Sequence, residues 1–316
     1  MKVNYFFLWH YSKISFVYPL MNADEKNILI INVSNDMDKV KSFSDLLLLD
    51  NISQVLFINN TLCEFVYSVL YRVFCYPFKN KSEKATLYLD GFRGYLPLFL
   101  ANFCDADEIN FYEEGESIYL KDALLNELRT ATLKDKIVRI IKKILFVKKV
   151  DLFCVKNIYV RDAERFSKAI DACAHGLKYT VHELDVISKL KALSNNDKTV
   201  LKKVFLSKVS VNKFENKKAI VLTQPLYMHG ILSKEETLSL FNKELVKLQS
   251  QNYQVFLKLH PRERDDIYLK DGVLRINGDF PFELLALLDV EFDKGITYNS
   301  TAINCKLIKE KVLLSV

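Results

Sequence analysis

Glycine and proline are scarce in this chain, and their scarcity limits the kinds of protein it can be. The 316 residues include only eight Gly and six Pro, too few for a collagen-like, fibrous or low-complexity protein. No run of about 18 uncharged apolar residues occurs, so we expect no transmembrane helix. Residues 1–21 are apolar but interrupted by polar side chains and lack a small-residue cleavage site, which favours a buried strand over a signal peptide.

Several motifs with a known chemistry are also missing. The six cysteines form no Cys-x-x-Cys pair, which argues against zinc and favours buried thiols in a reducing compartment. The chain has no Gly-x-Gly-x-x-Gly, no P-loop and no Gly-x-Ser-x-Gly. The dyad Asp265-Asp266 falls in an expected helix or loop rather than after a strand. The sequence therefore predicts chemistry without a metal or a resident cofactor.

What the chain does contain is typical of a globular protein, with 50% hydrophobic and 27% charged residues. The net charge of +6 is mild, so we do not expect nucleic-acid binding. Residues 134–149 hold seven Lys or Arg among apolar residues. They predict a basic amphipathic helix that contacts an anionic membrane surface, or else an ordinary solvated helix. We expect a cytoplasmic protein, either soluble or peripheral on the inner face of the membrane.

Short apolar segments alternate with helical patterns in both halves of the chain. Such alternation predicts parallel sheets covered by helices on both faces. A polar stretch at residues 187–218 looks like a linker. We expect two doubly wound α/β domains, residues 1–195 and 196–316, that face a central cleft. The predicted strands are 3–8, 27–33, 54–58, 86–89, 108–112, 158–160, 218–223, 253–259 and 311–316, and the predicted helices include 36–48, 61–75, 233–249 and 281–288.

Two carboxylates follow the predicted strand at residues 108–112. Neighbouring side chains at a strand end point in opposite directions, so only one of Glu113 and Glu114 can face a cleft. Like-charge proximity and partial burial raise a carboxyl pKa and make a better general base. The alternative is a solvated acidic turn.

An imidazole follows the predicted strand at residues 253–259. Pro261 stiffens the chain beside His260, and the flanking Lys258 and Arg262 can hold a phosphate. His260 can protonate a leaving phosphate oxygen or donate a hydrogen bond to it. The alternative is a capped loop histidine.

Three other segments carry polar groups at predicted element ends. Glu283 begins a helix, where it either stabilises the helix dipole or binds sugar hydroxyls. Gln224 follows a strand and can face the cleft. Ser300 and Thr301 lie in a strand-to-helix turn that suits phosphate, or they serve only as an N-cap.

In order and spacing these motifs resemble those of the bacterial sialyltransferases, and most of all the lipooligosaccharide sialyltransferase family, glycosyltransferase family 52. In that family Leu-Thr-Gln-Pro precedes Lys-x-His-Pro-Arg, as residues 222–225 precede residues 258–262 here. A Pro-x-Glu segment then precedes a Ser pair, as residues 281–283 precede Ser300-Thr301. The resemblance runs from about residue 86 to residue 302.

The resemblance implies a GT-B fold of two Rossmann-like domains and a metal-independent, inverting transfer of sialic acid from CMP-sialic acid. The implied acceptor is a terminal galactose of a surface saccharide, either lipooligosaccharide or capsule. Glu114 is implied as the base, although relatives with Asp in this motif leave Glu113 open. His260 is implied as the acid or the electrostatic stabiliser at the CMP phosphate. The predicted donor-binding residues are Gln224, Lys258, Pro261, Arg262, Glu283, Ser300 and Thr301.

The chemistry suits these residues independently, because negative charge grows on the leaving phosphate and needs fixed donors. Two alternatives stay open at this point. One is a GT-B transferase of the same family with another nucleotide sugar, and the other is a non-catalytic saccharide- or nucleotide-binding protein. The linkage, the acceptor and the oligomeric state, a homodimer included, are left open by the sequence.

Overall fold

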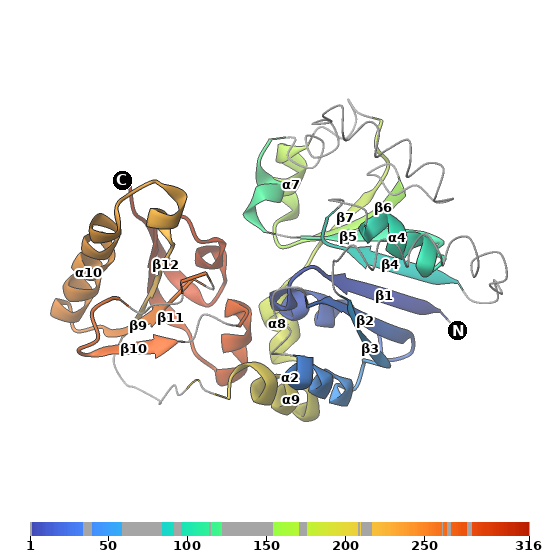
Figure 1. The fold of residues 1–316 in the computed structure, drawn as a ribbon, viewed down its shortest axis with the longest axis horizontal. Helices are drawn as coiled ribbons and strands as arrows, with labels where there is room; N and C mark the ends of the chain where they lie inside the picture. Colours follow the sequence, from blue (N-terminus) through green and yellow to red (C-terminus); the bar gives the residue numbers. More distant parts are fainter. Residues whose placement is uncertain are drawn as a thin grey trace. The chain divides into compact units, whose positions relative to one another are not determined.

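The computed structural model describes residues 2–33, 40–58, 84–91, 96–113, 115–121, 154–170, 176–207, 209, 217–260, 262–263, 267–276 and 280–315. The chain forms two compact units, Met1–Val186 and Ile187–Val316, and each is built on one parallel sheet (Figure 1). The expected α/β class is therefore confirmed.

The sheet of the first unit has seven strands in the order β3-β2-β1-β4-β5-β6-β7, and all pairs are parallel. The order reverses between β1 and β4, which is the switch point of a doubly wound fold. The strands are β1 (Val3–Leu8), β2 (Lys26–Asn32), β3 (Gln54–Ile58), β4 (Ala85–Leu89), β5 (Glu108–Tyr112), β6 (Val155–Val160) and β7 (Thr180–Glu183).

One face of this sheet is apolar at its centre. Successive strand residues point to opposite faces, and Leu87, Phe111 and Ile158 lie on the same face with at most 2% exposure. Two helices, α4 (Leu96–Phe103) and α7 (Ala163–Ala169), add Leu100 and Phe166 to this core. The first unit also contains α1 (Ile14–Val17) and α2 (Val40–Ser44).

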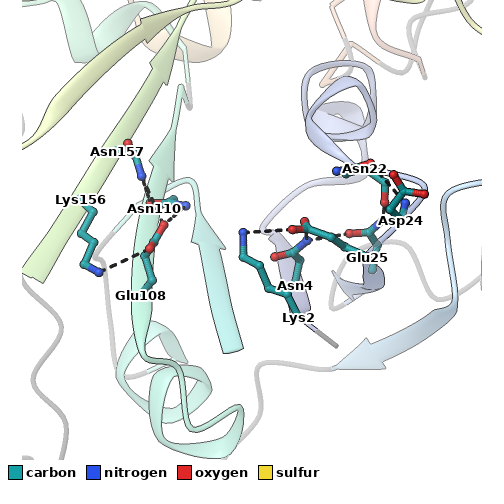
Figure 2. A network of polar contacts seen from close by, with 10 residues as sticks. Lys2, Asn4, Asn22, Asp24, Glu25, Glu108, Asn110, Lys156 and Asn157 are labelled. Atoms are coloured by element: carbon teal, nitrogen blue, oxygen red, sulfur yellow. Dashed lines mark hydrogen bonds and ion pairs between the residues drawn. The ribbon is translucent and has the colours of Figure 1, made fainter. Parts of the chain in front are cut away.

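Asparagines lie on the opposite face, near the amino ends of β1 and β2 and at the middle of β5 and β6 (Figure 2). Asn4 on β1 is paired with Asn27 on β2 and donates to its Oδ1 at 3.0 Å. Asn157 on β6 donates to Oδ1 of Asn110 on β5 at 2.9 Å. A one-residue slip would turn these amides toward the apolar face, where an unpaired buried amide costs about 1–3 kcal/mol. This asparagine belt therefore makes the strand register specific.

The sheet of the second unit has five strands in the order β10-β9-β8-β11-β12, again all parallel. Its order reverses between β8 and β11. Gly295 on β11 is required by close packing, because a Cβ there would lie 2.7 Å from Cγ2 of Ile308. The strands are β8 (Lys218–Leu222), β9 (Gln254–Lys258), β10 (Val273–Ile276), β11 (Phe292–Thr297) and β12 (Ile308–Leu313).

The long helix of the second unit, α10 (Lys234–Ser250), begins as its sequence predicts. Oγ of Ser233 accepts from the backbone N–H of Glu236 at 3.1 Å, and the Ser233 N–H donates to Oε2 of Glu236 at 2.8 Å. The helix expected at residues 281–288 is a 3-10 helix, η10 (Phe282–Leu288). The expected helix at residues 61–75 lies outside the described residues.

The stretch interpreted as a linker is largely helical in its described part, up to residue 207. It holds α8 (Val186–Lys191) and α9 (Asn195–Phe205), so the expected cut after residue 195 falls inside a helix. The polar Ser-Asn-Asn-Asp segment looked like a loop, but Ser194 is an N-cap whose Oγ accepts from the Asp197 N–H at 3.1 Å. Ser and Asn are common at both kinds of position, which explains the error.

Candidate active site

Three loops meet at the carboxyl ends of β9, β8 and β11, which are neighbours in the second sheet. Oγ1 of Thr297 donates to the Leu222 carbonyl at 2.8 Å and accepts from the Ser300 N–H at 3.3 Å. The Thr223 N–H donates to the Lys258 carbonyl at 3.1 Å. Because β8 and β11 flank the switch point, ligands of such sheets bind at this edge. The structure brings three predicted site residues to it, namely Gln224, His260 and Ser300.

His260 is held as a neutral ring with a defined tautomer. Its Nδ1 accepts from the backbone N–H of Arg262 at 3.2 Å, so the hydrogen of the neutral ring is on Nε2. Partial burial, with the positive charges of Arg262, Lys258 and His229, lowers the pKa of His260 to about 4. None of the described residues accepts from Nε2, so this N–H is available to a ligand at neutral pH.

A buried carboxylate that the sequence interpretation missed binds the backbone of His260. Glu263 is only 7% exposed. Its Oε2 accepts from the Thr223 hydroxyl and, at 3.2 Å, from the His260 N–H. Its Oε1 accepts from the Tyr268 hydroxyl at 2.6 Å. The available signal was its position directly after the His-Pro-Arg motif.

The structure describes some of the remaining predicted donor-binding residues but not all of them. Lys258 is 7% exposed, and its Nζ lies 4.7 Å from the centre of the Phe280 ring, next to the segment that begins η10. Glu283 is half-buried in the first turn of η10, and Arg262 is exposed. Pro261 and the side chain of Thr301 lie outside the described residues.

In the first unit Glu113 is fully buried, with no exposed side-chain surface. Its Oε1 accepts from Nε of Arg161 at 2.7 Å within an ion pair. Its Oε2 accepts from the Arg161 N–H at 2.8 Å and from the Tyr119 hydroxyl at 2.5 Å. Burial and the neighbouring Glu113 charge raise the pKa of Tyr119 far above its usual value, so the hydroxyl stays a donor. Both oxygens of Glu113 are therefore engaged.

Two sequence predictions cannot be followed in this unit. Glu114 and the basic segment at residues 134–149 lie outside the described residues. Sequence analysis did not single out Trp9, which follows β1 at the switch point of the first sheet and is 38% exposed. The backbone N–H of Trp9 donates to Oδ2 of Asp90, a buried residue that follows β4, at 3.2 Å.

The ion pair of Glu113 leads to a stability prediction. Arg161→Met leaves a buried carboxylate without its countercharge, which is expected to cost about 3–5 kcal/mol in the free energy of unfolding. Urea denaturation followed by circular dichroism would measure it. Lys156→Met, which breaks the exposed pair with Glu108 at 3.4 Å, is the control and should cost at most about 1 kcal/mol. Equal losses in the two variants would contradict the prediction.

The low pKa of His260 leads to a prediction on acid sensitivity. Between pH 6.5, the usual pKa of histidine, and about pH 4, His260 is protonated in the unfolded state but neutral in the native state. Stability therefore falls as the pH drops from 6.5 to 4, and levels off in this respect below 4. His260→Gln, which does not titrate, is expected to show a smaller loss between pH 7 and pH 4.5. A loss as large as that of the unchanged protein would show that His260 does not contribute.

Within the residues that the structure describes, there is neither a membrane-spanning helix nor a cluster of metal ligands. No helix within them has both the length and the apolarity needed to cross a membrane. Nor do three or more His, Cys, Asp or Glu side chains come together there as a metal site would require.

Comparisons with known structures agree with this fold. A sialyltransferase from Photobacterium damsela matches with a TM-score of 0.56 and 14% identity, over 99% of this chain and 74% of that one. A second Photobacterium damselae sialyltransferase structure, limited to its GT-B domain, matches with a TM-score of 0.52 and 14% identity, over 97% and 89%. The UDP-GlcNAc 2-epimerase from Neisseria meningitidis, bound to UDP-GlcNAc, gives 0.51 and 15%, over 96% and 79%. At these identities the matches show the fold, which is of the expected GT-B type.

The family comparison is more specific. No curated protein matches the chain in sequence. The family described as alpha-2,8-polysialyltransferase matches residues 86–303, which is more than half of the chain. This confirms the sequence-based assignment to a bacterial sialyltransferase family and to glycosyltransferases as a class of enzyme. The chain belongs to the alpha-2,8-polysialyltransferase family.

Proposed function

We propose that this glycosyltransferase moves sialic acid from CMP-sialic acid to the non-reducing end of a surface glycan, with inversion and without a metal. The observation that carries the proposal is the meeting of Gln224, His260 and Ser300 at the switch-point edge of the second sheet. The family match supports it, because it spans all three residues.

In this proposal the acceptor hydroxyl attacks the anomeric carbon while the bond from that carbon to the CMP phosphate breaks. The hydroxyl proton passes to Glu114, and the electron pair of the breaking bond stays on the phosphate oxygen. His260 donates its Nε2–H to that oxygen as a neutral group, because its lowered pKa makes a protonated ring scarce at neutral pH. Of the two roles open for His260, the lowered pKa favours electrostatic stabilisation over general acid catalysis.

We assign the other donor-binding roles to residues at or near the same edge of the second sheet. The Ser300 hydroxyl can bind the phosphate together with Thr301, while the Ser300 N–H donates to Oγ1 of Thr297 and thereby orients the turn. Glu283 in the first turn of η10 can accept from the ribose hydroxyls. Lys258, Arg262 and Pro261 supply positive charge and a stiff chain beside the phosphate, and Gln224 binds from the end of β8.

Two acceptors fit this proposal. The resemblance seen in the sequence implies a terminal galactose, of a lipooligosaccharide or a capsule. The description of the matching family instead favours a glycan that already ends in sialic acid and an α2,8 linkage. Assays with lactose and with sialyllactose, followed by linkage analysis of the product, would decide between them.

Thermal unfolding with nucleotides tests the donor. At equal concentration CMP is expected to raise the melting temperature more than UDP or GDP, because the ligand that binds the native state most tightly stabilises it most. The shift should be the same in EDTA if no metal takes part. A UDP or GDP shift equal to or larger than that of CMP would favour another nucleotide sugar. Binding of CMP without any transfer would favour the non-catalytic alternative.

Peripheral attachment to the inner face of the cytoplasmic membrane through residues 134–149 is an expectation from sequence alone. The positive charge and apolar residues of that segment support it. The formation of a homodimer is likewise only an expectation.

A further inference from the structure

We propose that Glu263 is a positioning residue for His260, which fixes the imidazole so that its Nε2–H meets the donor phosphate. The inference deepens the proposed function and rests on it for the identity of the ligand.

The contacts of Glu263 hold the backbone of His260 on both sides, at its N–H and at its carbonyl. Its carboxylate accepts from the His260 N–H at 3.2 Å, and its own N–H donates to the His260 carbonyl at 2.9 Å. The Thr223 hydroxyl donates to the same carboxylate and accepts from the His260 N–H at 3.0 Å. Tyr268 anchors the other oxygen at 2.6 Å. Both peptide groups of His260 are thus bound to Glu263 or to a residue that Glu263 holds.

Glu263 acts on the imidazole of His260 through the backbone of Arg262. The turn closed by Glu263 places the Arg262 N–H 3.2 Å from Nδ1 of His260, and that contact selects the tautomer with hydrogen on Nε2. A carboxylate that is 7% exposed is costly to bury unless several donors hydrogen-bond to it. Removal of the carboxylate or of one of its donors therefore loosens the turn and releases the ring.

In this proposal Glu263 preorganises His260 for catalysis. A donor fixed before the reaction stabilises developing charge without reorganisation at the moment of bond breaking. A misplacement of about 1 Å can cost about a hundredfold in rate. Glu263 does not touch the donor in this scheme, and its effect passes entirely through His260.

The first experiment reads the ring directly and needs no activity. Two-bond ¹H–¹⁵N spectra of the full chain should show His260 as the neutral Nε2–H tautomer at pH 7, with a pKa near 4. In Glu263→Gln the tautomers should mix and the pKa should rise toward 6.5, because water reaches a loosened ring. An unchanged tautomer and an unchanged pKa in Glu263→Gln would overturn the inference.

The second experiment is a double-mutant cycle on the rate of transfer from CMP-sialic acid. Glu263→Gln alone is expected to lower kcat by about thirtyfold to a hundredfold, yet by less than about twofold in a His260→Ala background. The control is Asp293→Asn, which removes a carboxylate that accepts from the Lys218 N–H at 3.0 Å at the amino end of β8. It should lower the melting temperature and leave kcat unchanged.

The outcomes separate the two proposals. Equal losses from Glu263→Gln in both backgrounds would mean that Glu263 supports the fold but does not act through His260. A protein that neither binds CMP nor transfers sialic acid would refute the proposed function, and the ring spectra would still decide the positioning role of Glu263.

Discussion

Replacing His260 with alanine is expected to lower kcat/KM for sialyl transfer by about a thousandfold while the protein stays folded. The expectation follows from the loss of one preorganised donor at a site of developing charge, which typically costs about a hundredfold to a thousandfold. The ring is half-buried at the end of β9 with its Nε2–H available. Steady-state rates, with circular dichroism as the check on folding, would measure the effect.

His260→Gln separates the two roles that His260 can have. A Gln amide can donate from a similar distance but cannot transfer a proton, so it should retain at least about tenfold more activity than Ala if the ring acts as a neutral donor. Equal losses in both variants would favour general acid catalysis. His229→Ala is the matched control, because His229 is an exposed neighbour on the 3-10 turn after β8 and should change the rate by less than about threefold.

Glu114→Gln is expected to lower turnover by at least about a hundredfold, as the loss of a general base does. The choice between the two carboxylates rests on Glu113, whose oxygens are both bound by Arg161 and Tyr119. A carboxylate so engaged has to give up a partner before it accepts a proton from substrate. Glu113→Gln should therefore act mainly on the free energy of unfolding.

Measuring both variants at the same fraction of folded protein makes this comparison decisive. If Glu113→Gln, corrected for its folded fraction, loses more activity than Glu114→Gln, the base is Glu113 and its ion pair must open during the reaction. Glu114→Asp serves as the conservative variant and should recover part of the activity lost in Glu114→Gln.

Much of the fold was predictable because its central strands are short apolar runs. Segments 3–8, 54–58 and 108–112 coincide with β1, β3 and β5. The strands that were missed carry a different signal. The edge strands β7 and β10 are too polar or too short to stand out, and β11, with Asp293, Lys294 and Gly295, was expected only as a strand without bounds before the Ser300 turn. Their place in the sheet is decided by pairing with neighbours, which a single sequence does not reveal.

The site was predictable only where a motif follows a strand directly. His260, Gln224 and Ser300 were singled out on that ground and reach one edge of the sheet. Glu263 and Thr223 were not, because their role lies in hydrogen bonds to backbone groups of other segments. The roles of the site residues in catalysis stay predictions until the variants above are measured.

The asparagine belt on the first sheet has a practical consequence. It lies near the amino ends of β1 and β2 and at the middle of β5 and β6 (Figure 2), whereas the acidic motif follows the carboxyl end of β5. An engineer who wants a more stable first unit should therefore keep both amide pairs and mutate other positions, because an apolar replacement of one partner leaves the other amide without its hydrogen bond.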